Sequence, residues 1–179
     1  MPEIKTPKIK TPKDRFLAKE PQAVESTEKR AYNSQTFYKP QTGENILNAH
    51  TGHIHYKDVI TGELKEIDST IIQKGDYFEM DKASYHLRVP KYTDEFIQFD
   101  NQYEGDSHRI EMKLVGEKKE FIKTDKSHLL AKDVFGQGID LELGTGYDSF
   151  RKEIVINEKP TDLSKDLEFK FELKVDGLK

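Results

Sequence analysis

Residues 167–175 read Leu-Glu-Phe-Lys-Phe-Glu-Leu-Lys-Val, so apolar and charged side chains alternate over nine positions. Successive side chains of a β-strand point to opposite faces, and this alternation therefore predicts a strand with one face buried and the other in water. A strand this regular favours a fold built from antiparallel sheets. The face predicted to be buried consists of Leu167, Phe169, Phe171, Leu173 and Val175.

Upstream of this strand, from residue 32 onwards, the chain consists of short β-rich runs separated by turn signals. Roughly ten runs at 8–12-residue spacing, without long helical patterns between them, predict an antiparallel β-sandwich, jelly-roll-like, over residues 32–179. Because the last run ends close to Lys179, we expect either a strand that closes the sheet or a chain cut from a longer protein near a module border. The other runs are residues 36–38, 46–56, 64–72, 77–80, 85–89, 96–99, 109–115, 120–122, 139–143 and 153–156.

Residues 1–31 predict an extended basic arm and a connector. The pentapeptide IKTPK occurs at 4–8 and again at 9–13, and a proline in each copy prevents an internal helix or a central strand. We expect the arm to bind a neighbouring subunit; the alternative is a solvated, disordered tail. Residues 14–31 predict a polar connector with a short helix after Pro21. The predicted partner-binding residues are Ile4, Lys5, Pro7, Lys8, Ile9, Lys10, Pro12 and Lys13.

Composition excludes several classes of protein. The chain has no Cys, which excludes disulfide scaffolds, cysteine-ligated zinc or iron–sulfur sites and thiol enzymes. No apolar run approaches the roughly 18 residues of a membrane span. The first residues lack the apolar segment of a secretory signal, so we expect no signal peptide.

Charge is distributed unevenly between the arm and the body. Residues 1–15 carry five basic and two acidic side chains, whereas the whole chain has a net charge of -4. The body is therefore acidic, which argues against a DNA-binding domain because such a domain presents a basic folded face. We do not expect the chain to bind nucleic acid, except through the basic arm.

Three of the six histidines fall within HTGHIH at residues 50–55. In a strand His53 and His55 share a face, and such a pair can supply two imidazole ligands to a metal, as it does in cupins. The other cupin positions do not match, since Gly52 lies next to the pair and Glu63 lies eight residues beyond His55. We therefore expect two surface histidines on the wet face of a strand, and neither a metal nor any other cofactor.

Other motifs do not predict catalysis. Residues 100–111 match a calcium loop in part, but a polar hairpin between two strands is the stronger interpretation. The glycines at 136, 138, 144 and 146 predict turns around the run at 139–143, because no helix or P-loop lysine follows them. No serine lies in a G-x-S-x-G elbow, and the chain has no Trp for sugar stacking. We expect a protein that is not an enzyme.

Short motifs carry a resemblance to one family. They are KR at 29–30, SQTF at 34–37, HIHYKD at 53–58 and EIDSTI at 66–71, followed by IDL at 139–141, KEIVI at 152–156, KP at 159–160 and FKFEL at 169–173. In this order they resemble the β-rich N-terminal module of Rhs/YD-repeat-like bacterial surface proteins and related phage structural proteins. The resemblance covers residues 29–178 and implies a β-sandwich scaffold without a catalytic site. Leu64 departs from the pattern, since family members often have an aromatic residue there.

The resemblance, the arm and the missing export signal together favour a structural virion protein, capsid-associated or part of a tail or fibre base. Such a protein assembles in the host cytoplasm and binds other virion subunits, as a homo-oligomer or a lattice. No membrane partner is expected. The alternatives are an Rhs-like surface or toxin-delivery module and a carbohydrate-binding β-sandwich.

Overall fold

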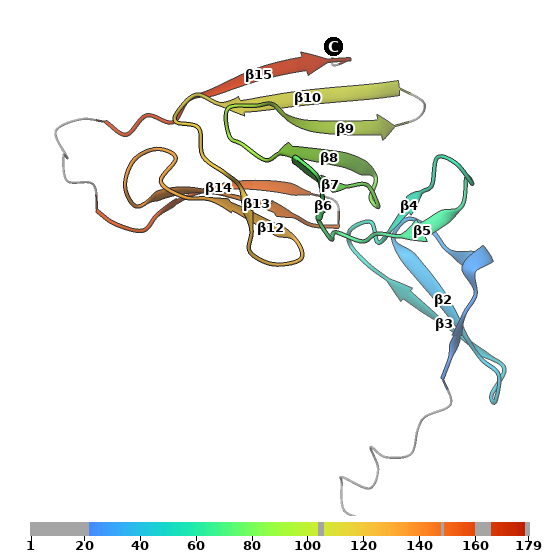
Figure 1. Cartoon of the computed structure of the whole chain (residues 1–179). Helices are drawn as coiled ribbons and strands as arrows, with labels where there is room; N and C mark the ends of the chain where they lie inside the picture. Colours follow the sequence, from blue (N-terminus) through green and yellow to red (C-terminus); the bar gives the residue numbers. More distant parts are fainter. Residues whose placement is uncertain (1–21, 104–105, 148, 160–165, 178–179) are drawn as a thin grey trace, which may run out of the picture.

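The computed structural model describes residues 22–103, 106–147, 149–159 and 166–177, which are built from antiparallel strand pairs (Figure 1). Within these residues there is no α-helix, and a 3₁₀ turn, η1 (Thr27–Lys29), lies where the sequence predicted a short helix after Pro21. The prediction of an all-β antiparallel fold is confirmed.

A six-stranded sheet forms one layer of the sandwich. Five consecutive strands form a meander, and the last strand of the chain then returns to pair with the fifth of them at the edge of the sheet. In spatial order the strands are β15 (Phe171–Asp176), β10 (Asp106–Leu114), β9 (Ile97–Tyr103), β8 (Tyr85–Pro90), β7 (Tyr77–Met80) and β6 (Ile72–Lys74).

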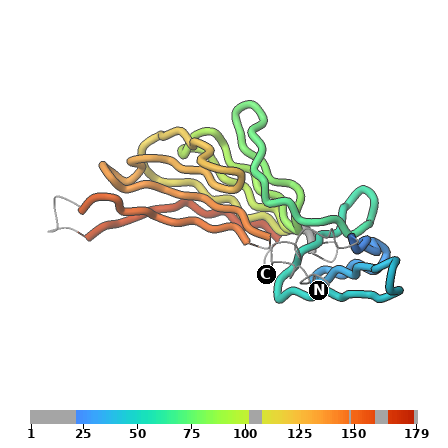
Figure 2. The backbone as a smooth tube through the Cα atoms, turned by 90° about the horizontal axis from the view of Figure 1, so that it is seen from below, coloured from blue at the N-terminus to red at the C-terminus, as the bar shows by residue number. Residues whose placement is uncertain are grey.

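A four-stranded sheet forms the second layer and lies against the first (Figures 1 and 2). Its strands follow the order of the chain: β11 (Ile122–Lys123), β12 (His128–Ala131), β13 (Ile139–Thr145) and β14 (Phe150–Ile156). Among the described strands, the chain passes between the two sheets after β10 and again after β14. The connectivity therefore differs from a jelly roll, because short connections favour pairing between neighbours in sequence.

The hydrophobic core lies between the two layers and takes alternate residues from the central strands β7, β8 and β12, whereas β13 is buried along almost its whole length. A single buried cluster joins both sheets, and fully burying one such side chain contributes about 1.5–3 kcal/mol. The alternation in the sequence therefore identifies the inner faces of the central strands correctly. Its most buried apolar members include Ile71, Met80, Leu87, Val89, Phe121, Leu129, Leu141 and Leu143.

A small N-terminal unit lies beside one end of the sandwich (Figure 1). Its three-stranded sheet has the order β1–β2–β3, and a separate hairpin pairs β4 with β5. The continuous run expected at 46–56 is wrong, because the chain bends around Gly52 between β3 and β4. The strands are β1 (Val24–Glu25), β2 (Ser34–Lys39), β3 (Glu44–Ala49), β4 (His55–Lys57) and β5 (Leu64–Glu66).

Arg30 ties the N-terminal sheet to the hairpin. Its guanidinium donates two hydrogen bonds of 2.7 Å to the carboxylate of Glu25 on β1 and a third, of 3.0 Å, to the carbonyl oxygen of Leu64 on β5. The hydrogen bonds from Arg30 hold the pKa of Glu25 below its usual range. Because the paired form is charged, this pair stabilises the fold above the ordinary pKa of glutamate, and the stabilisation is lost as the pH falls through the lowered pKa.

Replacing Arg30 with Met should loosen this junction. Loss of hydrogen bonds to a charged group costs about 1.5–3 kcal/mol, so hydrogen exchange of the β1 and β5 amides should accelerate while the sandwich stays unchanged. The acid-induced loosening of the junction should also become shallower, because Glu25 then titrates near its ordinary pKa. Arg151→Met is the matched control, since Arg151 is exposed and lies 3.6 Å from Glu153 in a surface pair. Equal effects of the two substitutions would contradict the assignment.

Candidate functional site

The two sheets leave one side of the sandwich open. β15 is the outermost strand of the six-stranded sheet and β14 is the outermost strand of the four-stranded sheet. Both run along the same side of the molecule, where they are the reddest strands in Figure 2. Among the described residues neither strand pairs with another strand at its outer edge, so both edges present unpaired backbone groups.

An apolar cleft of about 310 Å³ opens between these two edges. The strand register explains why its lining is apolar: Met112 of β10 lies between Ile97 of β9 and Leu173 of β15, and all three point toward the opposite sheet. The size is at the lower end of the range for small-molecule sites. The cleft is lined by Ile97, Phe99, Ile110, Met112, Phe150, Lys152 and Leu173.

The inner face of β15 extends beyond the sheet that faces it. Leu173 is 62% exposed and Val175 is 54% exposed, while Ile110 on the neighbouring strand is 38% exposed. The prediction that this face is buried is therefore wrong for Leu173 and Val175, because six strands face four and the layers differ in width. The strand predicted at 167–175 is wrong at its start, because β15 begins at Phe171 and the exposed Leu167 precedes it.

Lys152 of β14 places an ammonium group at the wall of the cleft. Its Nζ lies 3.6 Å from the centre of the Phe171 ring, a distance at which the ring face attracts a cation. Burial lowers the pKa of Lys152. The run predicted at 153–156 ended short of this position, and a lysine on a strand is expected on the solvent-exposed face.

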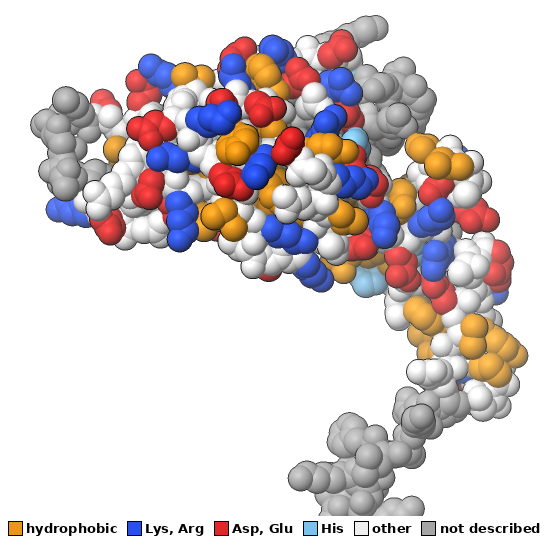
Figure 3. Space-filling view, in the orientation of Figure 1, with side chains coloured by type: hydrophobic (Ala, Val, Ile, Leu, Met, Phe, Trp, Pro, Cys, Tyr) orange, Lys and Arg blue, Asp and Glu red, His pale blue; other side chains and the backbone are white. Residues whose placement is uncertain are grey.

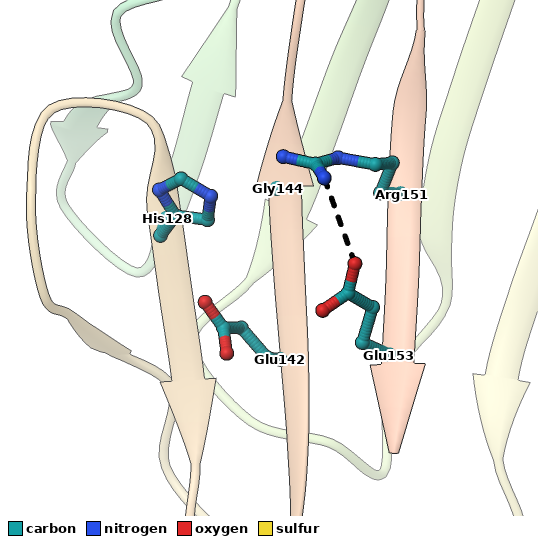
Figure 4. Close-up of a pocket in the computed structure, with 5 residues that line it drawn as sticks. All are labelled: His128, Glu142, Gly144, Arg151 and Glu153. Atoms are coloured by element: carbon teal, nitrogen blue, oxygen red, sulfur yellow. Dashed lines mark ion pairs between the residues drawn. The ribbon is translucent and has the colours of Figure 1, made fainter. Parts of the chain in front are cut away.

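A second, shallow pocket lies on the outer face of the four-stranded sheet (Figure 4). Its volume of about 10 Å³ leaves room for no more than one water molecule. Arg151 and Glu153 line it and form an ion pair of 3.6 Å with each other. Gly144 lies within β13 and lines this pocket, so the prediction of a turn glycine at 144 is wrong.

Beside this pocket, Asp125, Ser127 and His128 form a local cluster. The Nδ1 atom of His128 lies 2.9 Å from Asp125 and 3.2 Å from the hydroxyl of Ser127. A Ser-His-Asp triad requires the serine and the aspartate on opposite ring nitrogens, whereas here both contact the same one. The cluster therefore closes a tight turn and does not have the geometry of a nucleophilic triad.

The two histidines singled out as weak metal candidates do not lie together on a wet face. His55 is fully buried and donates from Nδ1 to the carbonyl oxygen of Ala31 at 2.7 Å. His53 lies against the ring of Tyr32, with 5.2 Å between ring centres. The expectation of two surface histidines is wrong for His55, because its ring anchors β4 to the N-terminal sheet. In the described part of the chain, no group of three or more His, Asp or Glu side chains is arranged to hold a metal ion.

The other predicted sites have these outcomes. The segment compared with a calcium loop is a hairpin of β9 and β10, and the carboxylate of Asp100 binds the guanidinium of Arg109 within it. The predicted partner-binding residues of the arm lie outside the described residues: Ile4, Lys5, Pro7, Lys8, Ile9, Lys10, Pro12 and Lys13.

Comparison of the chain with family models, curated proteins and solved structures gives no match. Across the described residues, no helix is long and apolar enough to cross a membrane.

The position of Lys152 can be checked by titration. Because burial disfavours the charged form, the lysine ¹³Cε resonance of residue 152 should titrate below the ordinary pKa of 10.5. Its charged form is penalised in the folded state, so stability should rise as the pH increases through the lowered pKa. Lys152→Met should abolish this rise, and Lys132→Met, which alters a lysine that does not line the cleft, should leave it unchanged. A titration midpoint at or above 10.5 would place Lys152 in water.

Proposed function

We propose that this chain is a non-catalytic structural protein whose β-sandwich joins subunits of an assembly. The observation that carries the proposal is the open side, where two unpaired strand edges flank an apolar cleft. Soluble proteins that act alone generally cover or protect such edge strands. Exposed backbone groups next to apolar side chains would otherwise form hydrogen bonds with a strand of another chain.

A second apolar patch supports the same function. Val24, Tyr38 and Leu47 lie on one face of the N-terminal sheet, since Val24 is opposite Tyr38 and Leu47 is opposite Thr36. All three side chains are exposed, with Leu47 at 65%. This patch begins at Val24, shortly after the basic arm in the sequence.

Within this function, we favour a virion component over other assemblies. The support is the duplicated basic arm and the resemblance of residues 29–178 to a module shared with phage structural proteins. Extended arms bind neighbouring subunits through main-chain hydrogen bonds at sheet edges and through side chains in pockets. Assembly in the host cytoplasm, followed by residence in the particle, is part of this proposal.

An Rhs-like surface or toxin-delivery module is the second candidate, because the same motifs resemble that family. The genes next to the coding sequence distinguish the two: portal, terminase and tail genes support a virion protein, whereas wall-associated or toxin genes support the surface module. A carbohydrate-binding sandwich would instead give hits on a glycan array.

Removing the arm tests how the subunits are joined. Tagged full-length chain and chain lacking residues 1–13 are expressed in a host that produces the particles, which are then purified on a density gradient. We expect the full-length chain in the particle band and the truncated chain outside it, with the same far-UV circular dichroism for both bodies.

Paired substitutions separate the apolar anchors from the charge. If Ile4 and Ile9 fill pockets on a neighbour, Ile4→Ser with Ile9→Ser should reduce incorporation more than Lys5→Ser with Lys10→Ser. Unchanged incorporation of the truncated chain would exclude the arm as the contact.

A further inference from the structure

We propose that two copies of this chain join through β15, which pairs antiparallel with β15 of the second copy around a two-fold axis at Leu173. The two six-stranded sheets then form one continuous sheet. The inference rests on the proposed assembly function for its role and names the first partner as a second copy.

The backbone of β15 has the required donors and acceptors on its free edge. The amide of Val115 donates to the carbonyl oxygen of Lys170 at 2.9 Å, which makes Lys170 part of a hydrogen-bonded pair with the β10 side. Hydrogen-bonded residues alternate along an antiparallel strand, so Glu172 and Lys174 also direct their backbone groups toward β10. Phe171, Leu173 and Val175 therefore direct their N–H and C=O groups outward. In the proposed pairing these three positions form the hydrogen-bonded pairs between the copies.

In this register the charged side chains of β15 are complementary to those of β15 in the second copy. With the axis at Leu173, Glu172 lies opposite Lys174 of the second copy, and Lys170 lies opposite Asp176 of the second copy. Symmetry repeats each pair, so every charged position from 170 to 176 meets the opposite charge. Directly opposed pairs of unlike charge stabilise a sheet, and like charges destabilise it.

Alternative registers lose this complementarity. Moving the axis to Lys174 places that lysine opposite itself and Glu172 opposite Asp176, and moving it to Glu172 places Lys170 opposite Lys174. A shift by one residue turns the apolar face of one strand toward the charged face of the other. The axis at Leu173 is thus selected by both faces of the strand.

Opposite charges already lie side by side on the outer face of the six-stranded sheet. Arg109 of β10 is bonded to Asp100 of β9 and lies opposite Asp176 of β15, while Lys113 lies 2.8 Å from Glu172. Figure 3 shows acidic and basic side chains mixed over one face of the sandwich. The second copy extends these rows of alternating charge, because its Lys170 follows Asp176 and its Lys174 follows Glu172.

Pairing also covers the apolar inner face of β15, which the four-stranded sheet leaves exposed. Pairing brings Leu173 next to Leu173 of the second copy and places Phe171 opposite Val175 of the second copy, so side chains exposed at 62% and 54% are shielded.

The N-terminal arm fits this edge less well. Its charged positions in 4–13 are all lysines, which can pair with Glu172 and Asp176 but not with Lys170 and Lys174, and the prolines at 7 and 12 lack the N–H that pairing needs.

Charge reversal with reconstitution by mixing tests the pairing. The full-length chain should sediment as a dimer in analytical ultracentrifugation. Glu172→Lys and Lys174→Glu should each raise the dissociation constant by about 100-fold, tenfold for each of two symmetry-related contacts. An equimolar mixture of the two variants should dimerise again, because each unlike pair is then restored between the copies. Val175→Pro should also give a folded monomer, because the amide it removes faces the free edge and not β10.

Failure of this inference is separable from failure of the proposed function. The chain lacking residues 1–13 should still dimerise, so loss of the dimer on that deletion would identify the arm as the occupant and overturn the β15 pairing. A wild-type monomer at about 100 µM, or a mixture of charge variants that stays monomeric, would also overturn it. Failed particle incorporation with an intact dimer would count against the virion role alone.

Discussion

The unequal width of the two packed sheets is the constraint on which the rest of the structure depends. Six strands face four, so the central strands bury their apolar residues while β15 presents the same kind of face to solvent. Leu141 and Leu143 in the middle of the smaller sheet are almost completely buried, whereas Leu173 at the edge of the larger sheet is mostly exposed. The fold therefore completes its core in the middle of the sheets and leaves it incomplete at the edge formed by β15.

This asymmetry connects the fold to an assembly function. One end of the sandwich lies beside the N-terminal unit (Figure 1), which Arg30 and His55 fasten internally through hydrogen bonds. The open side carries an apolar cleft, the charge of Lys152 against the Phe171 ring and two free strand edges. Burial of apolar area at such a side favours association, and the pattern of charge beside it selects the partner and the register.

Alternation in the sequence is enough to predict the class of fold and the inner positions of the central strands, such as Leu87 and Val89. It predicts the inner face of β15 equally well, but not whether another layer covers that face, because the width of a sheet depends on long-range pairing. The burial of His55 was missed for the same reason, since its partner Ala31 lies 24 positions away. The position of Lys152 in the cleft wall follows from the facing sheet and leaves no local signal.

Amide hydrogen exchange along β15, followed by NMR at low and high protein concentration, tests the central claim most directly. The amides of Glu172 and Lys174 bond to β10 and should be protected at both concentrations. The amides of Phe171, Leu173 and Val175 should exchange rapidly in dilute protein and become protected in concentrated protein. Rapid exchange of these three amides at both concentrations would show that the edge of β15 stays uncovered and would contradict the account.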